Sequence, residues 1–258
     1  MKDKVDEFYR VAREYTLRLR AEHPSSFCSG EDENPVLTVA QKGNSRFHII
    51  GEHHFSLQLL DLLHTTIVPQ IISDHASWFV FKEAARIAKK TDTPPGEYPL
   101  EAYLLLDPIG AYLHAVCETH EIPYEDPILS MKSPEVEQIA LTRGISSDTI
   151  TGCKLFFELS AMEDAETATT DPKKLAYLSE ILERSAEDVI RLLESELPLL
   201  TTEDGEPTKR FWSVISAWNK ANEERIKQLV DAYRTKTNGL ICVGLGHLEA
   251  VISGISPS

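Results

Sequence analysis

Apolar residues recur along this chain in two spacings, one typical of helices and one typical of buried strands. Spacings of three and four predict an amphipathic helix over residues 3–21 and another over residues 56–72, which Pro69 is expected to kink or shorten. Apolar runs of strand length occupy residues 36–40, 47–50 and 78–81. The first two runs flank a turn-forming sequence at 42–45, which predicts a β-hairpin.

Helical patterns follow at 99–106 and 108–120, and a short strand is expected near residues 122–124. Strands that alternate with helices in this order indicate a mostly parallel sheet. From residue 133 to residue 237 only helical patterns occur. Helix starts in this stretch are indicated by Ser133-Pro134, Asp171-Pro172 and Ser185-Ala186.

The predicted fold class is therefore α/β, with a mixed, mostly parallel sheet core built from both ends of the chain and a large helical insertion. The core is expected at 1–130 plus 238–258 and the insertion at 131–237. A long helix over 206–233 ends the insertion, and its aromatic residues are expected to face the core: Phe211, Trp212 and Trp218. Leucine-rich helices at 176–200 fit either core packing or a dimer interface, which leaves a homo-oligomer open.

Two segments far apart in the sequence share one form, an apolar strand that runs into a Gly-x-x-His turn. They are Ile49-Ile50-Gly51-Glu52-His53-His54 and Val243-Gly244-Leu245-Gly246-His247. Buried strands of an α/β fold deliver the residues that follow them to the carboxyl edge of the sheet, where ligands bind. If the two strands are neighbours, His54 and His247 meet in one crevice.

Imidazole can bind a divalent metal or transfer protons near neutral pH, so His54 and His247 are the first candidates for chemistry. Glu52 could accept a proton from an attacking water or orient an imidazole, although an acid at the start of a helix is the ordinary alternative. Glu83 follows the apolar run 78–81 and could act as a ligand or a base. An exposed ion pair with Arg86 is its ordinary alternative.

Composition narrows the class of partner. The formal net charge of −15 opposes non-specific binding to nucleic acid and to anionic membranes, because both reward clusters of Lys and Arg. The four cysteines are scattered and favour reduced thiols in a cytoplasm. The charged N-terminus does not resemble a signal peptide, and no apolar run approaches the roughly 20 residues of a membrane span. We expect a soluble cytoplasmic protein.

These motifs together resemble the Tiki/TraB superfamily, which includes erythromycin-esterase-like and haem-binding ChaN-like proteins. The family pattern is a strand into Gly-x-x-His, a later strand ending in an acidic residue with an arginine nearby, a helix with Glu-Arg, and a final strand into Gly-x-Gly-His. The corresponding residues here are Gly51 to His54, Glu83 with Arg86, Glu224-Arg225, and Gly244 to His247. Members are associated with metal-dependent peptide cleavage, macrolide ester hydrolysis or haem binding.

The resemblance implies a hydrolase as the first hypothesis, with a peptide, an ester or another amide as substrate. His54, Glu83 and His247 would hold a divalent metal (zinc, manganese or cobalt) or activate a water directly. Glu52 would be the base, and Arg225 would stabilise the oxyanion.

Two other functions remain open at this point. The same crevice could hold haem or another small ligand without chemistry. Alternatively, the helical insertion could be an interaction module on a catalytically silent α/β core.

Overall fold

The computed structural model describes residues 2–22, 35–52, 56–83, 104, 107–160, 162, 165–202 and 206–255. The chain forms two compact units. Unit 1 comprises Met1–Ile128 and Asn222–Ser258, and unit 2 comprises Leu129–Ala221.

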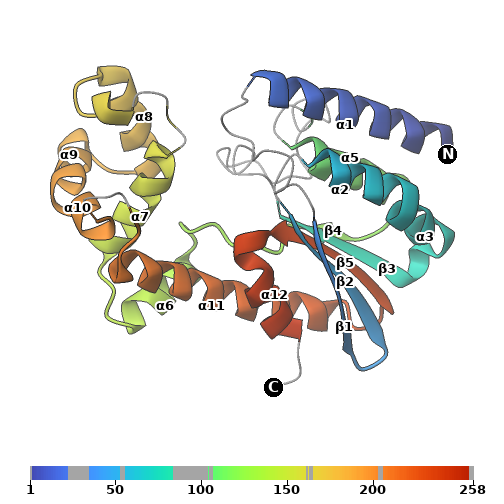
Figure 1. The fold of residues 1–258 in the computed structure, drawn as a ribbon. Helices are drawn as coiled ribbons and strands as arrows, with labels where there is room; N and C mark the ends of the chain where they lie inside the picture. The colour runs from blue at the N-terminus through green and yellow to red at the C-terminus, as the bar shows by residue number, and fades with distance from the viewer. Residues whose placement is uncertain are drawn as a thin grey trace. The chain divides into compact units, whose positions relative to one another are not determined.

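Unit 1 contains a five-stranded mixed sheet in the order β1-β2-β5-β3-β4 (Figure 1). The strands are β1 (Val36–Lys42), β2 (Ser45–Glu52), β3 (Trp78–Lys82), β4 (Tyr124–Glu125) and β5 (Asn238–Gly244). β1 runs antiparallel to β2 as the predicted hairpin, and all other pairings are parallel. The strand nearest the C-terminus, β5, lies between β2 and β3. The predicted α/β class, with a mostly parallel sheet built from both ends of the chain, is confirmed.

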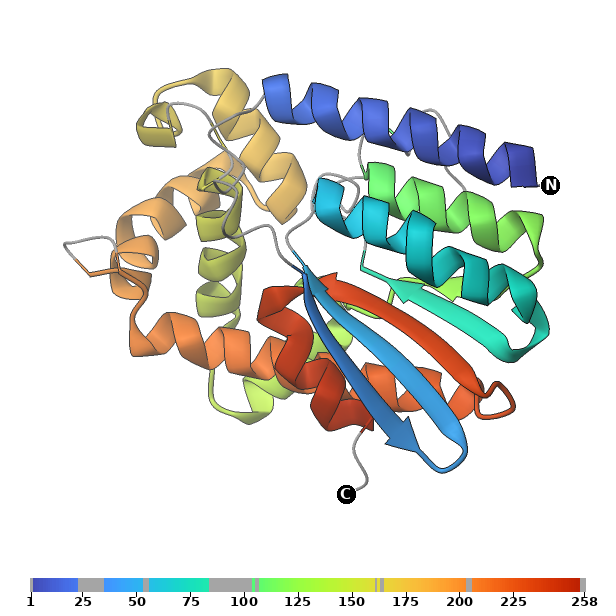
Figure 2. The same ribbon diagram turned by 45° about the vertical axis from the view of Figure 1, so that its right-hand side comes forward.

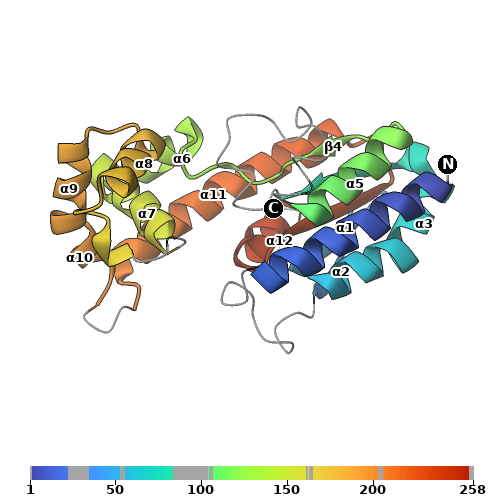
Figure 3. The same ribbon diagram turned by 90° about the horizontal axis from the view of Figure 1, so that it is seen from above.

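Helices cover both faces of this sheet (Figure 2). On one face lie α2 (Leu57–Leu62), η2 (Leu63–Ile67), α3 (Val68–Ser73), the short η3 (His75–Ser77) and α5 (Pro108–Thr119). α1 (Lys2–Glu22) packs across α2 and α5 on the side away from the sheet. On the other face lie α12 (Leu248–Ile255) and the C-terminal part of α11 (Lys209–Ala232). Figure 3 shows from above how α1 lies along α2 and α5.

The predicted helix over residues 56–72 is interrupted as expected. Its middle turn, η2, is a π-helix, and α3 starts with Val68-Pro69. Because proline has no N–H to donate and its ring crowds the preceding turn, a regular α-helix cannot continue unchanged through Pro69. The interruption does not break the hydrophobic contact of these helices with the core, because Leu59, Leu63 and Ile71 are all fully buried.

Unit 2 is helical, as the sequence predicts. Its elements are α6 (Pro134–Thr142), α7 (Ser147–Leu159), η6 (Ala165–Thr167), α8 (Pro172–Leu182), α9 (Ala186–Ser195), α10 (Leu197–Leu200) and the first part of α11. Three expected helix starts are confirmed, because the side chains of Ser133, Asp171 and Ser185 each accept a backbone N–H of the first turn. Most of the leucine-rich stretch forms core, including Leu178, Leu182 and Leu192.

One expected core residue lies elsewhere. Phe211 is buried and Trp218 packs against the same cluster, but the Trp212 side chain is 56% exposed. Adjacent helical residues differ by about 100° in direction, and here Phe211 points into the core while Trp212 lies at the margin of that face.

The insertion also ends earlier than the expected residue 237, because the boundary between the units falls within α11 at residues 221 and 222. The part of α11 after this boundary packs on the sheet of unit 1. Arg225 of α11 pairs with Glu125 of β4, and the ring of Tyr233, which directly follows α11, stacks on Phe79 of β3 at 5.4 Å. These long-range contacts are not visible in the helical periodicity.

The expected helix over 99–106 lies outside the described residues, apart from Leu104. None of the helices among the described residues combines the length and apolar character that a membrane-spanning helix needs.

Candidate functional site

The carboxyl ends of β2, β5 and β3 meet at one edge of the sheet in unit 1. The two strands that lead into the Gly-x-x-His segments, β2 and β5, are neighbours, with Glu52 in register with Gly244. Lys82 at the end of β3 is in register with Cys242 of β5. This edge therefore gathers residues from three segments that are distant in the sequence. His53 and His54 lie outside the described residues, so the predicted meeting of His54 with His247 remains a prediction.

Two of the predicted site residues lie side by side at this edge. The Nε2 atom of His247, in η7 (Leu245–His247), is 3.7 Å from Oε1 of Glu83, which directly follows β3. Their side chains are only 10% and 8% exposed. A carboxylate beside an imidazole stabilises the imidazolium that forms when the ring accepts a proton.

Glu83 is held in place by the backbone of β5. Its N–H donates to the Cys242 carbonyl at 2.8 Å, which continues the parallel pairing by one residue beyond β3. Its Oε2 accepts the Gly244 N–H at 2.7 Å. Because one carboxylate oxygen is fixed by the strand that leads to His247, the other oxygen is directed at the imidazole.

Lys82 is a buried charge that the sequence analysis missed. Its Nζ lies 2.9 Å from Oε1 of Glu52 and 3.6 Å from Oδ2 of Asp107, and it also donates to the Glu83 carbonyl. The side chains of Lys82 and Glu52 are fully buried, and that of Asp107 is 1% exposed. A lysine directly after four apolar residues looks like the solvent-exposed end of a strand, so its burial was not expected.

Asp107 reaches Lys82 because it begins α5. Its Oδ1 accepts the Gly110 N–H at 2.9 Å, and Pro108 occupies the first turn, where no N–H is needed. The Asp107-Pro108 pair is a helix-start signal that the sequence could have revealed. Lys82 therefore links the ends of β2 and β3 to the start of α5, and it also contacts the backbone of Glu83.

These contacts enclose Glu52 in an ion pair. It was predicted as a base, but its carboxylate lies against Lys82 and the residue is 2% exposed. Ile50, Cys242 and Lys82 are in register, and Glu52 lies two residues beyond Ile50, so Glu52 belongs to the same face of the sheet.

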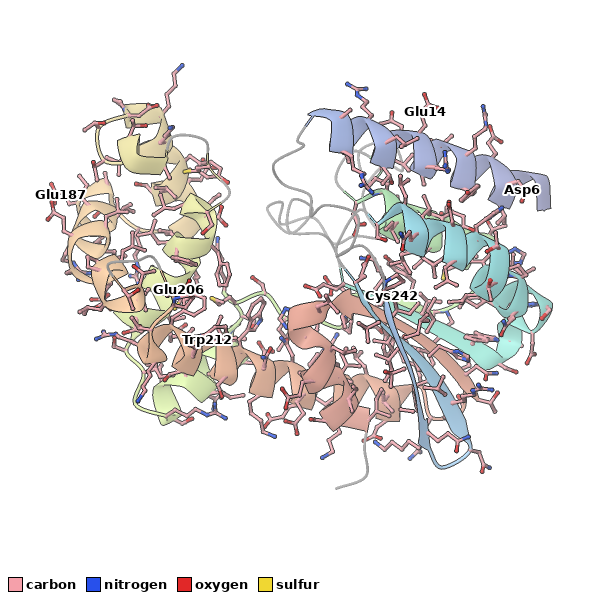
Figure 4. All side chains as sticks on the ribbon, in the orientation of Figure 1. Asp6, Glu14, Glu187, Glu206, Trp212 and Cys242 are labelled. Atoms are coloured by element: carbon pink, nitrogen blue, oxygen red, sulfur yellow. The ribbon has the colours of Figure 1, made fainter. Side chains whose placement is uncertain are left out.

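Cys242, labelled in Figure 4, lies in this environment and is fully buried. Burial, and then the nearby Glu52 carboxylate, raises the pKa of its thiol far above the usual value. Because only the thiolate is strongly nucleophilic, Cys242 is a packing residue at neutral pH.

Arg225 was expected to stabilise an oxyanion, and the structure places it beside an acid. Its Nη2 is 3.3 Å from Oε2 of Glu125, at the end of β4. The other oxygen of Glu125 accepts the Tyr233 hydroxyl at 2.6 Å. Burial, together with this bond to Glu125, raises the pKa of Tyr233 to about 12.

Gly51, the glycine of the first Gly-x-x-His segment, allows two segments of the chain to pack closely. A Cβ atom on Gly51 would lie 2.9 Å from Leu245 Cδ2 and 3.1 Å from Leu248 Cδ2. Both leucines belong to the segment that carries His247. Gly51 therefore lets this segment approach β2 closely, which fixes His247 over the sheet edge.

Two of the three predicted metal ligands, Glu83 and His247, lie among the described residues. Within the part of the chain that the structure describes, no group of three His, Cys, Asp or Glu side chains is arranged to hold a metal ion. Of the three predicted ligands, Glu83 and His247 are adjacent and His54 lies outside this part. One Glu83 oxygen already accepts the Gly244 N–H. A metal at this edge stays a prediction, and so does haem.

Comparisons of the chain with protein-family models, with curated proteins and with solved structures gave no match.

Proposed function

We propose that this protein is a hydrolase in which His247 activates a water molecule for attack on the carbonyl carbon of an ester or a peptide. The observation that carries this proposal is the Glu83–His247 pair, with Nε2 at 3.7 Å from Oε1, at the carboxyl edge of the sheet. Open α/β sheets bind their ligands at this edge. Electrostatic interactions are stronger where water is excluded, and both side chains are nearly buried.

In the proposed reaction, His247 takes a proton from water as the water oxygen bonds to the carbonyl carbon. The imidazolium then gives this proton to the leaving alkoxide or amine as the tetrahedral intermediate collapses. The products are a carboxylic acid and an alcohol or an amine. Glu83 is negatively charged next to the ring and stabilises the imidazolium between the two proton transfers.

The buried ion pairs of Lys82 with Glu52 and Asp107 hold Glu83 in position. Lys82 donates to the Glu83 carbonyl and is paired with Glu52 and Asp107, so its ammonium is a fixed charge and not a nucleophile. We assign no step to Glu52, which is enclosed by this ion pair, or to Arg225, which pairs with Glu125.

The first test is hydrolysis of p-nitrophenyl acetate and of a fluorogenic peptide library by the purified chain. The proposal expects turnover by the wild type and a loss of about 10²–10⁴-fold in the His247→Asn variant, the usual contribution of a general base. The matched control is His75→Asn, which changes an exposed histidine in η3 and should retain full activity. Full activity of His247→Asn, or no turnover of any substrate by the wild type, would contradict the proposal.

A further inference from the structure

A groove in unit 2 has the composition of a small-ligand site. It is lined by Arg143, Ile145, Lys209, Trp212, Ser213 and Ser216 and has a volume of about 420 Å³. Pockets for small ligands typically measure roughly 300–1,000 Å³. All six lining residues belong to unit 2, and none of them serves the Glu83–His247 site.

One wall of the groove is a single face of α11. Lys209, Trp212, Ser213 and Ser216 are separated by three, four and seven positions, so they project from the same side of the helix. Trp212 lies on the N-terminal part of α11 (Figure 4) and is 56% exposed, while its neighbour Phe211 fills the core. The sequence thus places a large aromatic side chain where core packing does not require one.

The opposite wall is a rigid turn after α6. Gly144 has a φ of +76°, a left-handed conformation that favours glycine. The Gly144 N–H donates to the Leu141 carbonyl at 3.0 Å, and the Ile145 N–H donates to the Ala140 carbonyl at 3.0 Å. This pair of bonds is a Schellman motif, which caps the helix and fixes the chain at Arg143 and Ile145.

The groove is positively charged on a chain whose formal net charge is −15. Its lining contains a guanidinium and an ammonium group and no acidic side chain. Arg143 reaches across to α11, where its Nη1 donates to the Ser216 hydroxyl at 3.1 Å. The two walls therefore meet at a cation and a hydroxyl, with the indole of Trp212 one turn away.

We propose that this groove binds a nucleoside monophosphate, recognised as a planar ring that carries a phosphate group. The exposed indole offers a flat apolar surface on which a base can stack. Arg143 and Lys209 supply the charge-assisted hydrogen bonds that a phosphate prefers. The Ser216 hydroxyl accepts from Arg143 and adds its O–H as a neutral donor, whereas the Ser213 hydroxyl already donates to the Lys209 carbonyl at 2.8 Å. Ring and phosphate are both needed, because the groove offers one aromatic surface and one pair of cations.

The test is isothermal titration calorimetry of the full chain with adenosine 5′-monophosphate, adenosine and ribose 5-phosphate. The proposal expects the nucleotide to bind at least about tenfold more tightly than either fragment. Trp212→Ala, Arg143→Ala and Lys209→Ala should each weaken nucleotide binding by about tenfold or more. Leu199→Ala and Lys173→Ala change exposed residues of the same unit outside the groove and should leave binding unchanged.

Circular dichroism of each variant checks that its helices are intact. No measurable nucleotide binding by the wild type would overturn the proposal. So would nucleotide binding that the three groove variants do not weaken, or ribose 5-phosphate binding as tightly as the nucleotide. Equal binding of hexaglutamate in competition with the nucleotide would also overturn it, since it would show a site for anionic peptides without ring recognition.

Discussion

The Nζ atom of Lys82 lies 2.9 Å from Oε1 of Glu52, and neither side chain is exposed to solvent. This ion pair joins the ends of β3 and β2 on either side of the central strand β5. Asp107 at the start of α5 supplies a second acid at 3.6 Å. A charge removed from such a buried group leaves its partners uncompensated.

Lys82→Met should therefore lower the free energy of unfolding by about 3–5 kcal/mol, because Glu52 and Asp107 would remain as buried, unmatched charges. The triple variant Lys82→Met, Glu52→Gln, Asp107→Asn removes all three charges together and should be more stable than the single variant. Urea denaturation of both variants makes the comparison. Equal stability of the single variant and the wild type would show that the ion pair does not contribute as inferred.

Gly51→Ala should destabilise unit 1 by about 1–3 kcal/mol and reduce hydrolysis, because the new Cβ would displace Leu245 and with it His247. Gly246→Ala is the matched control, since a Cβ there would meet no atom within 4 Å. Thermal denaturation and initial rates of ester hydrolysis measure the two effects. If both alanine variants behave alike, close packing at Gly51 does not set the position of His247.

The protein should lose stability as the pH falls below the ordinary histidine value. Burial lowers the pKa of His48, His114 and His120 below 6.5, with smaller effects of the neighbouring Arg46 at His48 and His75 at His120. Between these lowered values and 6.5, the unfolded chain binds more protons than the folded chain. The contribution of these histidines to the free energy of unfolding is therefore fully present above about pH 6.5 and is lost as the pH falls through this window.

Thermal midpoints at about pH 8 and about pH 5 test this pH dependence. His114→Gln removes one of the shifted groups, so the difference between the two midpoints should become smaller. Lys173→Gln changes an exposed residue that shifts none of these histidines and is the comparison. A wild-type thermal midpoint that is higher at the acidic pH would contradict the inference that these histidines are buried in their neutral form.

Arg225→Ala should leave ester hydrolysis nearly unchanged, because the guanidinium is paired with Glu125 at the end of β4. The cost in stability should be about 1 kcal/mol or less, since both side chains are about one-third exposed. Initial rates and urea denaturation give the two values. A loss of hydrolysis above about 10²-fold with intact folding would restore the oxyanion role that the sequence resemblance implies.

The sequence predicts the strands of the sheet well, because their apolar runs are short and bounded by turns. It also predicts that β2 and β5 carry the site to one edge, since both end in glycine before a histidine-bearing turn. The sequence does not reveal that the Lys82 side chain is buried, because the acids that neutralise its charge come from β2 and from the start of α5. A charged residue at the end of an apolar run looks exposed until its partners are located in space.

The environments of Arg225 and Trp212 also depend on contacts that the local sequence does not show. The Glu125 partner of Arg225 lies 100 positions away in sequence, so the ion pair depends on the packing of α11 against β4. The exposure of Trp212 depends on which face of α11 turns toward the core. Periodicity gives the width of that face but not which aromatic residue lies at its margin.

The most direct test of the proposed site is a double-mutant cycle on the rate of p-nitrophenyl acetate hydrolysis, with Glu83→Gln, His247→Asn and the double variant. If Glu83 acts through His247, the double variant should be no slower than His247→Asn alone, because residues that act as a unit are not additive. The matched control is Glu118→Gln at an exposed position of α5, which should retain full activity. Losses that multiply in the double variant, or full activity in both single variants, would contradict a catalytic Glu83–His247 pair.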